Sequence, residues 1–301
     1  MKKEILAKTY IFRKNRTLYL FIIYTLSIFW AFYLGPNLLD IILPDLLKQF
    51  YHLFKPLIIL LIEYIFTFLF LMTILYPLYM LYKKTEMGYN EILISSPIKS
   101  GDIFIGEFMG LLPFHLLGVL LVGPIITSLI MQVKKLTFLD FLIIYLCLFI
   151  LINLGLLIGN LIANSIEYFI SIKNYSEVKK ELILILISLI FVTIFYFFHY
   201  LFTFMISNPE IKNWIMIYPS FWYSNIIIFI IDRHALDLYI LDIWSSCGLA
   251  IVFPILCFFF SYQISNKFYN LGTKKSTNGS IIERENILYN ILKYFILKKY
   301  R

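Results

Sequence analysis

The chain has little charge and few cysteines. Only 15% of its 301 residues are charged, against about 25% in an ordinary soluble domain. Its three cysteines are too few for a disulfide scaffold. The low charge argues against a water-soluble globule, a disordered chain and a nucleic-acid-binding domain, so no nucleic-acid partner is expected.

The signatures of several enzyme classes are also missing. The sequence has no Cys-x-x-Cys, no His-Glu-x-x-His and no Gly-x-x-x-x-Gly-Lys-Ser/Thr segment. Its four histidines are isolated and show no ligand-type spacing. We therefore expect no catalytic residue, no metal site, no cofactor and no ATP hydrolysis on this chain.

Apolar residues are abundant instead. They make up 61% of the chain, and the mean hydropathy is +0.84. A membrane-spanning helix needs about 20 apolar residues. Six runs approach or exceed that length, and they cover residues 17–34, 57–82, 108–131, 141–163, 182–206 and 243–264. The pattern predicts an all-α, polytopic membrane helical bundle with six transmembrane helices, multi-pass in the cell membrane.

The basic residues predict the orientation of this bundle. The net charge is +8, and all but six of the 26 lysines and arginines fall in segments that a six-span chain places on one side. Positive charge collects on the cytoplasmic side of membrane proteins. Both termini are therefore predicted to be cytoplasmic. The six outer residues are Lys48, Lys55, Lys134, Lys135, Lys212 and Arg233.

A further apolar stretch precedes the last run. If residues 214–231 spanned the membrane, the basic C-terminal tail would face outside, and Pro219 and Ser220 interrupt the stretch. We interpret residues 207–242 as an outer excursion, a re-entrant or interfacial helix pair. The whole organisation is then a basic N-terminal tail (1–16), a six-span domain (17–265) and a cytoplasmic C-terminal tail with an amphipathic helix (266–301).

Two features within the runs bear on function or packing. Glu63 is the one carboxylate deep in a run, and such residues usually face the bundle interior or a cavity. A place in a translocation path is one interpretation of Glu63, and contact with the outer interface or protonation is the other. Gly155-x-x-x-Gly159 is typical of a close helix approach.

The loop after the second run, residues 83–107, carries most of the functional information. We expect its first part to continue the preceding helix and Ser95-Ser96-Pro97 to end it, because the residue before proline avoids the helical region. A second helix begins at Ser100 or Asp102. The segment is then either an elbow below the membrane that suits docking into a partner's groove, or an ordinary turn back into the membrane. The residues of the motif are Glu86, Gly88, Glu91, Ile92, Leu93, Ser96, Pro97, Ile98 and Gly106.

This motif resembles the type-2 family of ABC transporter permeases, the membrane subunits of many exporters. The order of acidic residue, glycine, acidic residue, aliphatic pair, small polar residue and proline follows the family, as does its place between the second and third spans. Tyr89 and Glu107 stand where the family usually has a small hydroxyl residue and a lysine.

The resemblance implies an assembly of two permease chains, as a homo- or heterodimer, with two ABC ATPase subunits. ATP and Mg²⁺ would be bound by the ATPase, and the segment 86–98 would couple ATP hydrolysis to transport. Two alternatives remain. One is a membrane enzyme acting on lipid-linked substrates, for which the outer set Asp232, Arg233, His234, Asp237 and Asp242 is the candidate. The other is a membrane scaffold without transport.

Overall fold

A computed structural model describes most of the chain. The described residues are 16–37, 51–84, 100–172, separate positions between 185 and 204, 209–236 and 240–265. Within these ranges the chain is helical, with short turns and no strand. The predicted all-α class is confirmed.

The helices are long and mostly apolar. They are α2 (Arg16–Phe29), which continues as the π-helical turn η2 (Trp30–Leu34), α5 (Tyr51–Lys84), α7 (Ser100–Met131), α8 (Phe138–Ile172), α10 (Pro209–Ile215), α11 (Pro219–Ile231) and a final helix, Ile243–Ser265.

Four of these helices contain a segment long and apolar enough to cross a membrane. The segments are Lys55–Tyr79, Phe104–Met131, Phe138–Ile166 and Ile243–Ser265. They correspond to the predicted runs 57–82, 108–131, 141–163 and 243–264, so the chain has the character of a membrane protein.

The other two predicted spans are not confirmed. The first run forms an apolar helix of shorter length, Leu18–Leu34. In the run 182–206 the structure describes separate helical positions, such as Ile185 and Tyr200. Six spans therefore remain a prediction.

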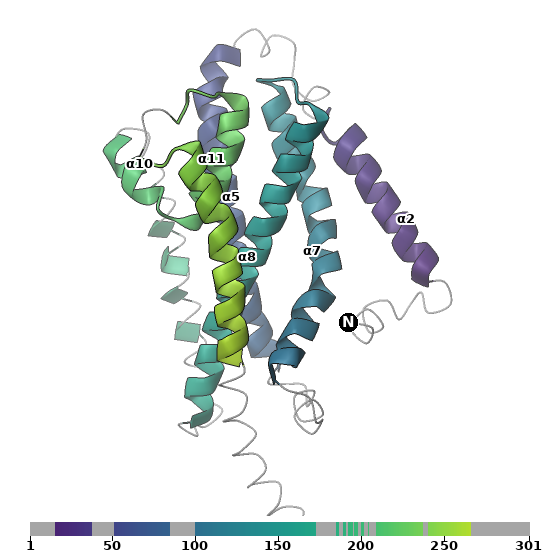
Figure 1. The fold of residues 1–301 in the computed structure, drawn as a ribbon, viewed down its shortest axis with the longest axis vertical. Coiled ribbons are helices and arrows are strands. Elements are labelled where there is room, and N and C mark those ends of the chain that lie inside the picture. The colour runs from purple at the N-terminus through teal and green to yellow at the C-terminus, as the bar shows by residue number, and fades with distance from the viewer. Residues whose placement is uncertain are drawn as a thin grey trace, which may run out of the picture.

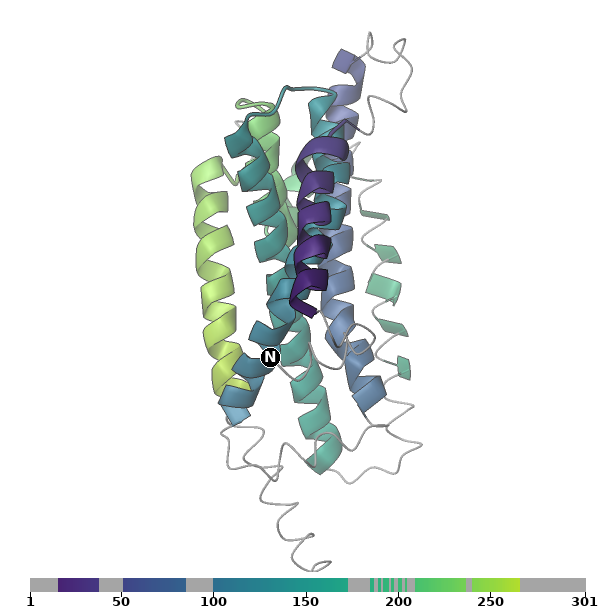
Figure 2. The ribbon, with the colours of Figure 1, turned by 90° about the vertical axis from the view of Figure 1, so that its right-hand side faces the viewer.

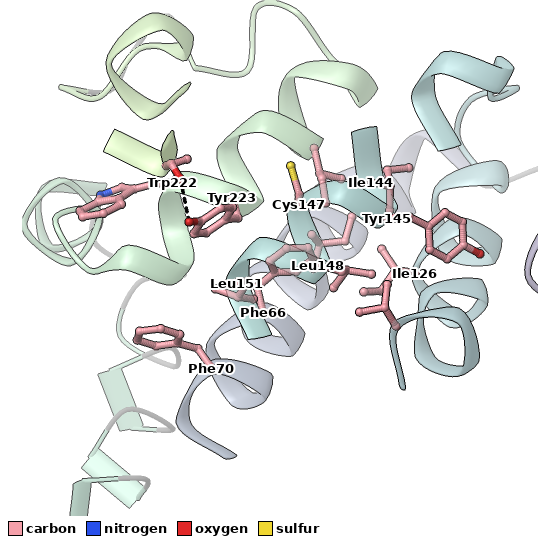
Figure 3. Close-up of a cluster of buried hydrophobic side chains, with 14 of the residues drawn as sticks. Phe66, Phe70, Ile126, Ile144, Tyr145, Cys147, Leu148, Leu151, Trp222 and Tyr223 are labelled. Carbon is pink, nitrogen blue, oxygen red and sulfur yellow. Dashed lines mark hydrogen bonds between the residues drawn. The ribbon is translucent and has the colours of Figure 1, made fainter. Parts of the chain in front are cut away.

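Helix α8 lies at the centre of the bundle. It packs along α5, and it also contacts α7 and α11. Figure 1 shows α5, α8 and α11 grouped together, with α7 and then α2 to one side; Figure 2 shows the final helix along a further face. The buried core runs through these helices and includes Phe66, Ile126, Leu148 and Leu151 (Figure 3).

The predicted close approach between helices is confirmed, and it joins α8 to α5. A Cβ atom on Gly155 would overlap the Thr73 hydroxyl. A Cβ atom on Gly159 would lie 2.5 Å from the backbone oxygen of Ile74 and 3.0 Å from the Pro77 ring. No side chain larger than glycine fits without displacement of α5.

Contacts between distant residues show that the helices alternate in direction. Lys55 at the start of α5 contacts Asp232 just after α11, and Lys134 just after α7 contacts Ile230. At the opposite end of the bundle, Phe104 of α7 packs against Phe258 of the final helix. We call these the α11 end and the opposite end.

Candidate functional site

The site centres on the hairpin of α10 and α11 at the α11 end. Proline begins both helices, Pro209 and Pro219, and a turn at residues 216–218 separates them. With 13 residues, α11 is about 20 Å long, shorter than a hydrocarbon core of about 30 Å. The stretch 214–231 is therefore not a single spanning helix.

Helix α11 is buried although it carries polar residues. Ser220, Ser224 and Asn225 are all fully buried. Ser220 Oγ lies 2.8 Å from Thr67 Oγ1 of α5, and the Asn225 amide donates to Ser246 Oγ of the final helix at 3.1 Å. These side chains hold α11 between two apolar helices, because a buried polar group without a partner is costly.

Aromatic residues of α11 extend the same contacts. The Tyr223 hydroxyl donates to the backbone oxygen of Ala250 at 2.9 Å (Figure 3). The Trp222 ring meets Phe253 edge to face, with ring centroids 5.2 Å apart. Helix α11 is thus packed into the bundle rather than resting on its surface.

Two lysines bind the C-terminal end of α11. Lys55 Nζ donates to Asp232 Oδ2 at 2.6 Å, and Lys134 Nζ donates to the backbone oxygen of Ile230 at 2.6 Å. The C-terminal end of a helix carries partial negative charge, which ammonium groups stabilise. The hydrogen bond from Lys55, with a second from the His234 backbone, lowers the pKa of Asp232 below its usual value.

A third lysine pairs with the carboxylate inside α5. Lys212 Nζ of α10 lies 2.8 Å from Glu63 Oε1, and the Glu63 side chain is only 2% exposed. Glu63 thus lies in the bundle interior, while its place in a translocation path stays a prediction. An unpaired buried charge is costly, and here Lys212 of the hairpin supplies a cation beside the carboxylate.

The ion pair borders a pocket of about 200 Å³. Its walls come from the first turns of α5, from α10, from α11 and from the turn after α11. The lining residues are Pro56, Ile59, Leu60, Glu63, Lys212, Ile228, Ala235 and Leu236. Apart from Glu63 and Lys212, all of the lining residues are apolar.

Most of the predicted coupling residues lie outside the described residues. These are Glu86, Gly88, Glu91, Ile92, Leu93, Ser96, Pro97 and Ile98. Gly106 is described, in α7, and a Cβ atom placed on it would meet no heavy atom within 4 Å. Packing among the described residues therefore does not require glycine at this position.

The predicted outer charged set does not converge on one point where it is described. Asp232 binds Lys55, whereas Asp242 accepts a hydrogen bond from the Ser245 backbone and caps the final helix. Hydrogen bonds from the Ser245 hydroxyl and backbone lower the pKa of Asp242. No group of three or more metal-ligating side chains occurs among the described residues.

Sequence reasoning did not find the partner of Glu63. Lys212 was assigned to the outer side as one of six basic residues, without a role. The available signal was charge balance: a carboxylate in an apolar run needs a cation, and Lys212 is the one basic residue within the apolar stretch before Arg233.

Comparisons with protein-family models, with curated proteins and with solved structures found no match to this chain. Any argument about function therefore starts from its own residues.

Proposed function

We propose that this chain is the membrane permease subunit of an ATP-driven exporter of the type-2 ABC class. The observation that carries the proposal is the motif of residues 86–106, which matches the order of residues in that family's coupling segment. Such a permease binds no nucleotide itself. A separate ATPase subunit would bind ATP and Mg²⁺ and drive the membrane chains between states.

The position of the motif supports this function. It links the end of α5 to the start of α7, and Figure 1 places both ends opposite the α10–α11 hairpin. A segment anchored by two long helices transmits force well, because each helix continues into the bundle core. Closure of a docked ATPase pair would then move α5 and α7, and a shift between two states would open a path.

The apolar bundle also supports a membrane transport role more than the enzyme alternative. An enzyme acting on lipid-linked substrates needs acidic or histidine side chains that converge at one membrane face. Among the described residues of the outer set, Asp232 is engaged by Lys55 and Asp242 by Ser245. Both serve the structure of the hairpin and the final helix.

The test is co-purification with an ATPase. The chain is co-expressed with a P-loop ATPase encoded by a neighbouring gene, and the complex is isolated through a tag on the ATPase. We expect the wild-type chain to co-purify and the Glu91→Ala and Pro97→Ala variants to be lost from the complex. Glu285→Ala, in the C-terminal tail, is the matched control and should be retained.

Two results would count against the proposal. Retention of both motif variants would show that residues 86–98 do not form the contact. Failure of the wild-type chain to bind the ATPase, with both proteins present in the membrane fraction, would contradict the permease assignment itself.

A further inference from the structure

The pocket beside Glu63 combines a buried anion with apolar walls. Glu63 Oε1 lies 2.8 Å from Lys212 Nζ, yet among the described residues no donor makes a well-directed hydrogen bond to this oxygen. A carboxylate accepts several hydrogen bonds. Glu63 therefore has acceptor capacity left over, at a place where leaving it unused is costly.

The cation that pairs with Glu63 comes from the shorter of the two helices. Glu63 belongs to the 34-residue helix α5, whereas Lys212 belongs to the 7-residue helix α10. Trp214 in α10 and Ile217 in the turn that follows it are 78% and 64% exposed. The carboxylate is thus fixed in the core, while its ammonium partner is carried on a short peripheral helix.

The pocket has the size and walls for a second alkylammonium group. Lys212 is the one cation among the described residues that line it, and Ile59, Leu60 and Leu236 supply apolar wall. A cavity of roughly 150 Å³ holds benzene, which has six heavy atoms. The 200 Å³ here accommodates the four-carbon stem and ammonium of a lysine side chain.

We propose that this pocket is a binding site for a primary ammonium group on a short apolar chain, such as the lysine side chain of a peptide, with Lys212 as its built-in competitor. The incoming ammonium replaces Lys212 at Glu63, and its methylene stem lies against the apolar wall. Exchange of one ammonium for another keeps the carboxylate compensated throughout. The site requires nothing of the ATPase and stands independently of the permease assignment.

The first test compares two variants that a purely structural ion pair would affect in the same direction. Binding of n-butylammonium to the purified full-length chain in detergent is measured by isothermal titration calorimetry. Lys212→Ala removes the competitor and leaves the carboxylate uncompensated, so we expect n-butylammonium to bind at least about tenfold more tightly than to wild type. Glu63→Gln removes the anion, and binding should be lost.

Control ligands separate the contribution of the ammonium charge from that of the butyl group. n-Butanol and butyrate have the same stem without the cation and should not bind to Lys212→Ala. Glu210→Gln changes another carboxylate of α10, one that is exposed, and should leave binding unchanged. If Glu63→Gln does not fold, Ala235→Trp fills the pocket from the turn after α11 and should abolish binding with Glu63 in place.

A competition experiment distinguishes a peptide from a lipid as the source of the ammonium group. N-acetyl-lysine amide should displace n-butylammonium, whereas phosphatidylethanolamine in nanodiscs should not, because its phosphate would face apolar walls. Displacement by that lipid alone would overturn the peptide source. Absence of n-butylammonium binding to Lys212→Ala, or equal binding of n-butanol, would overturn the site.

Discussion

Three of the six basic residues on the predicted outer side bind the same hairpin or belong to it. Lys55 and Lys134 neutralise the C-terminal end of α11, and Lys212 carries a charge from α10 to Glu63. Three lysines at this end thus bind carbonyl and carboxylate oxygens of the bundle. This use of lysine explains how an apolar hairpin with a buried polar face is held in place.

The Lys55–Asp232 ion pair predicts a dependence of stability on pH. The pKa of Asp232 is lowered in the folded chain, so the contribution of the pair is fully present above the unfolded value, close to 3.8, and is lost as the pH falls through the folded value. Both side chains are about one-third exposed, so the contribution should be below about 1 kcal/mol.

The measurement is the free energy of unfolding of wild type and Asp232→Asn between pH 2.5 and 7. The difference between them should be constant above about pH 5 and should shrink below 3.8. Lys55→Met removes the other partner of the ion pair. Its difference in unfolding free energy from wild type should also shrink as the pH falls below 3.8. A gap that is equally large at pH 2.5 and pH 7 would exclude this ion pair as its source.

At the scale of helices, the contact between α5 and α8 depends on missing side chains. Gly159 lets the α8 backbone approach Ile74 and Pro77 of α5, and the partner atom nearest to its missing Cβ is a backbone oxygen that cannot rotate away. Such an approach increases van der Waals contact, which is what holds helices together when lipid surrounds them.

Gly159→Ala should therefore destabilise the chain, by about 1–3 kcal/mol, as overpacking does elsewhere. The control is Gly118→Ala in α7, where a Cβ atom meets no heavy atom within 4 Å and the better helix propensity of alanine should leave stability unchanged or slightly raised. Both are measured as thermal unfolding in the same detergent. Equal midpoints for the two variants would contradict the close α5–α8 contact.

The sequence predicted these elements unevenly, for physical reasons. Long uncharged runs specify a membrane-length helix by composition, so the four segments long enough to cross a membrane were predicted within a few residues. Pro219 correctly predicted a break in the stretch 214–231. The burial of α11 was not predicted, because it depends on Thr67 and Ser246, which are distant in sequence. For the same reason the partner of Glu63 was missed.

For the whole molecule, alternation of helix direction decides which residues share a membrane face. The start of α5, the end of α7 and the end of α11 meet at the α11 end, through Lys55, Lys134 and Asp232. The start of α7 and the end of the final helix meet at the opposite end, where Asn164 donates to Ser265. Residues at the α11 end and residues at the opposite end therefore lie on opposite sides of the bundle, whichever compartment each end faces.

The charge distribution predicts which compartment each end faces, and cysteine labelling tests this prediction. Arg233 at the α11 end and Asp102 at the opposite end are both exposed, while the native Cys147 and Cys257 are buried and Cys247 is partly so. A membrane-impermeant maleimide should label Arg233→Cys in intact cells and label Asp102→Cys only after permeabilisation, with wild type as the background.

The reverse pattern would overturn the orientation while keeping the bundle, since both residues would still lie on opposite sides. Labelling of both variants in intact cells would contradict a membrane crossing by the helices between them. The orientation matters for both proposals, because the motif of residues 86–106 must face the cytoplasm to meet an ATPase, whereas the pocket beside Glu63 would then open toward the outside. A single labelling pattern thus tests whether the motif and the pocket lie on opposite sides of the membrane.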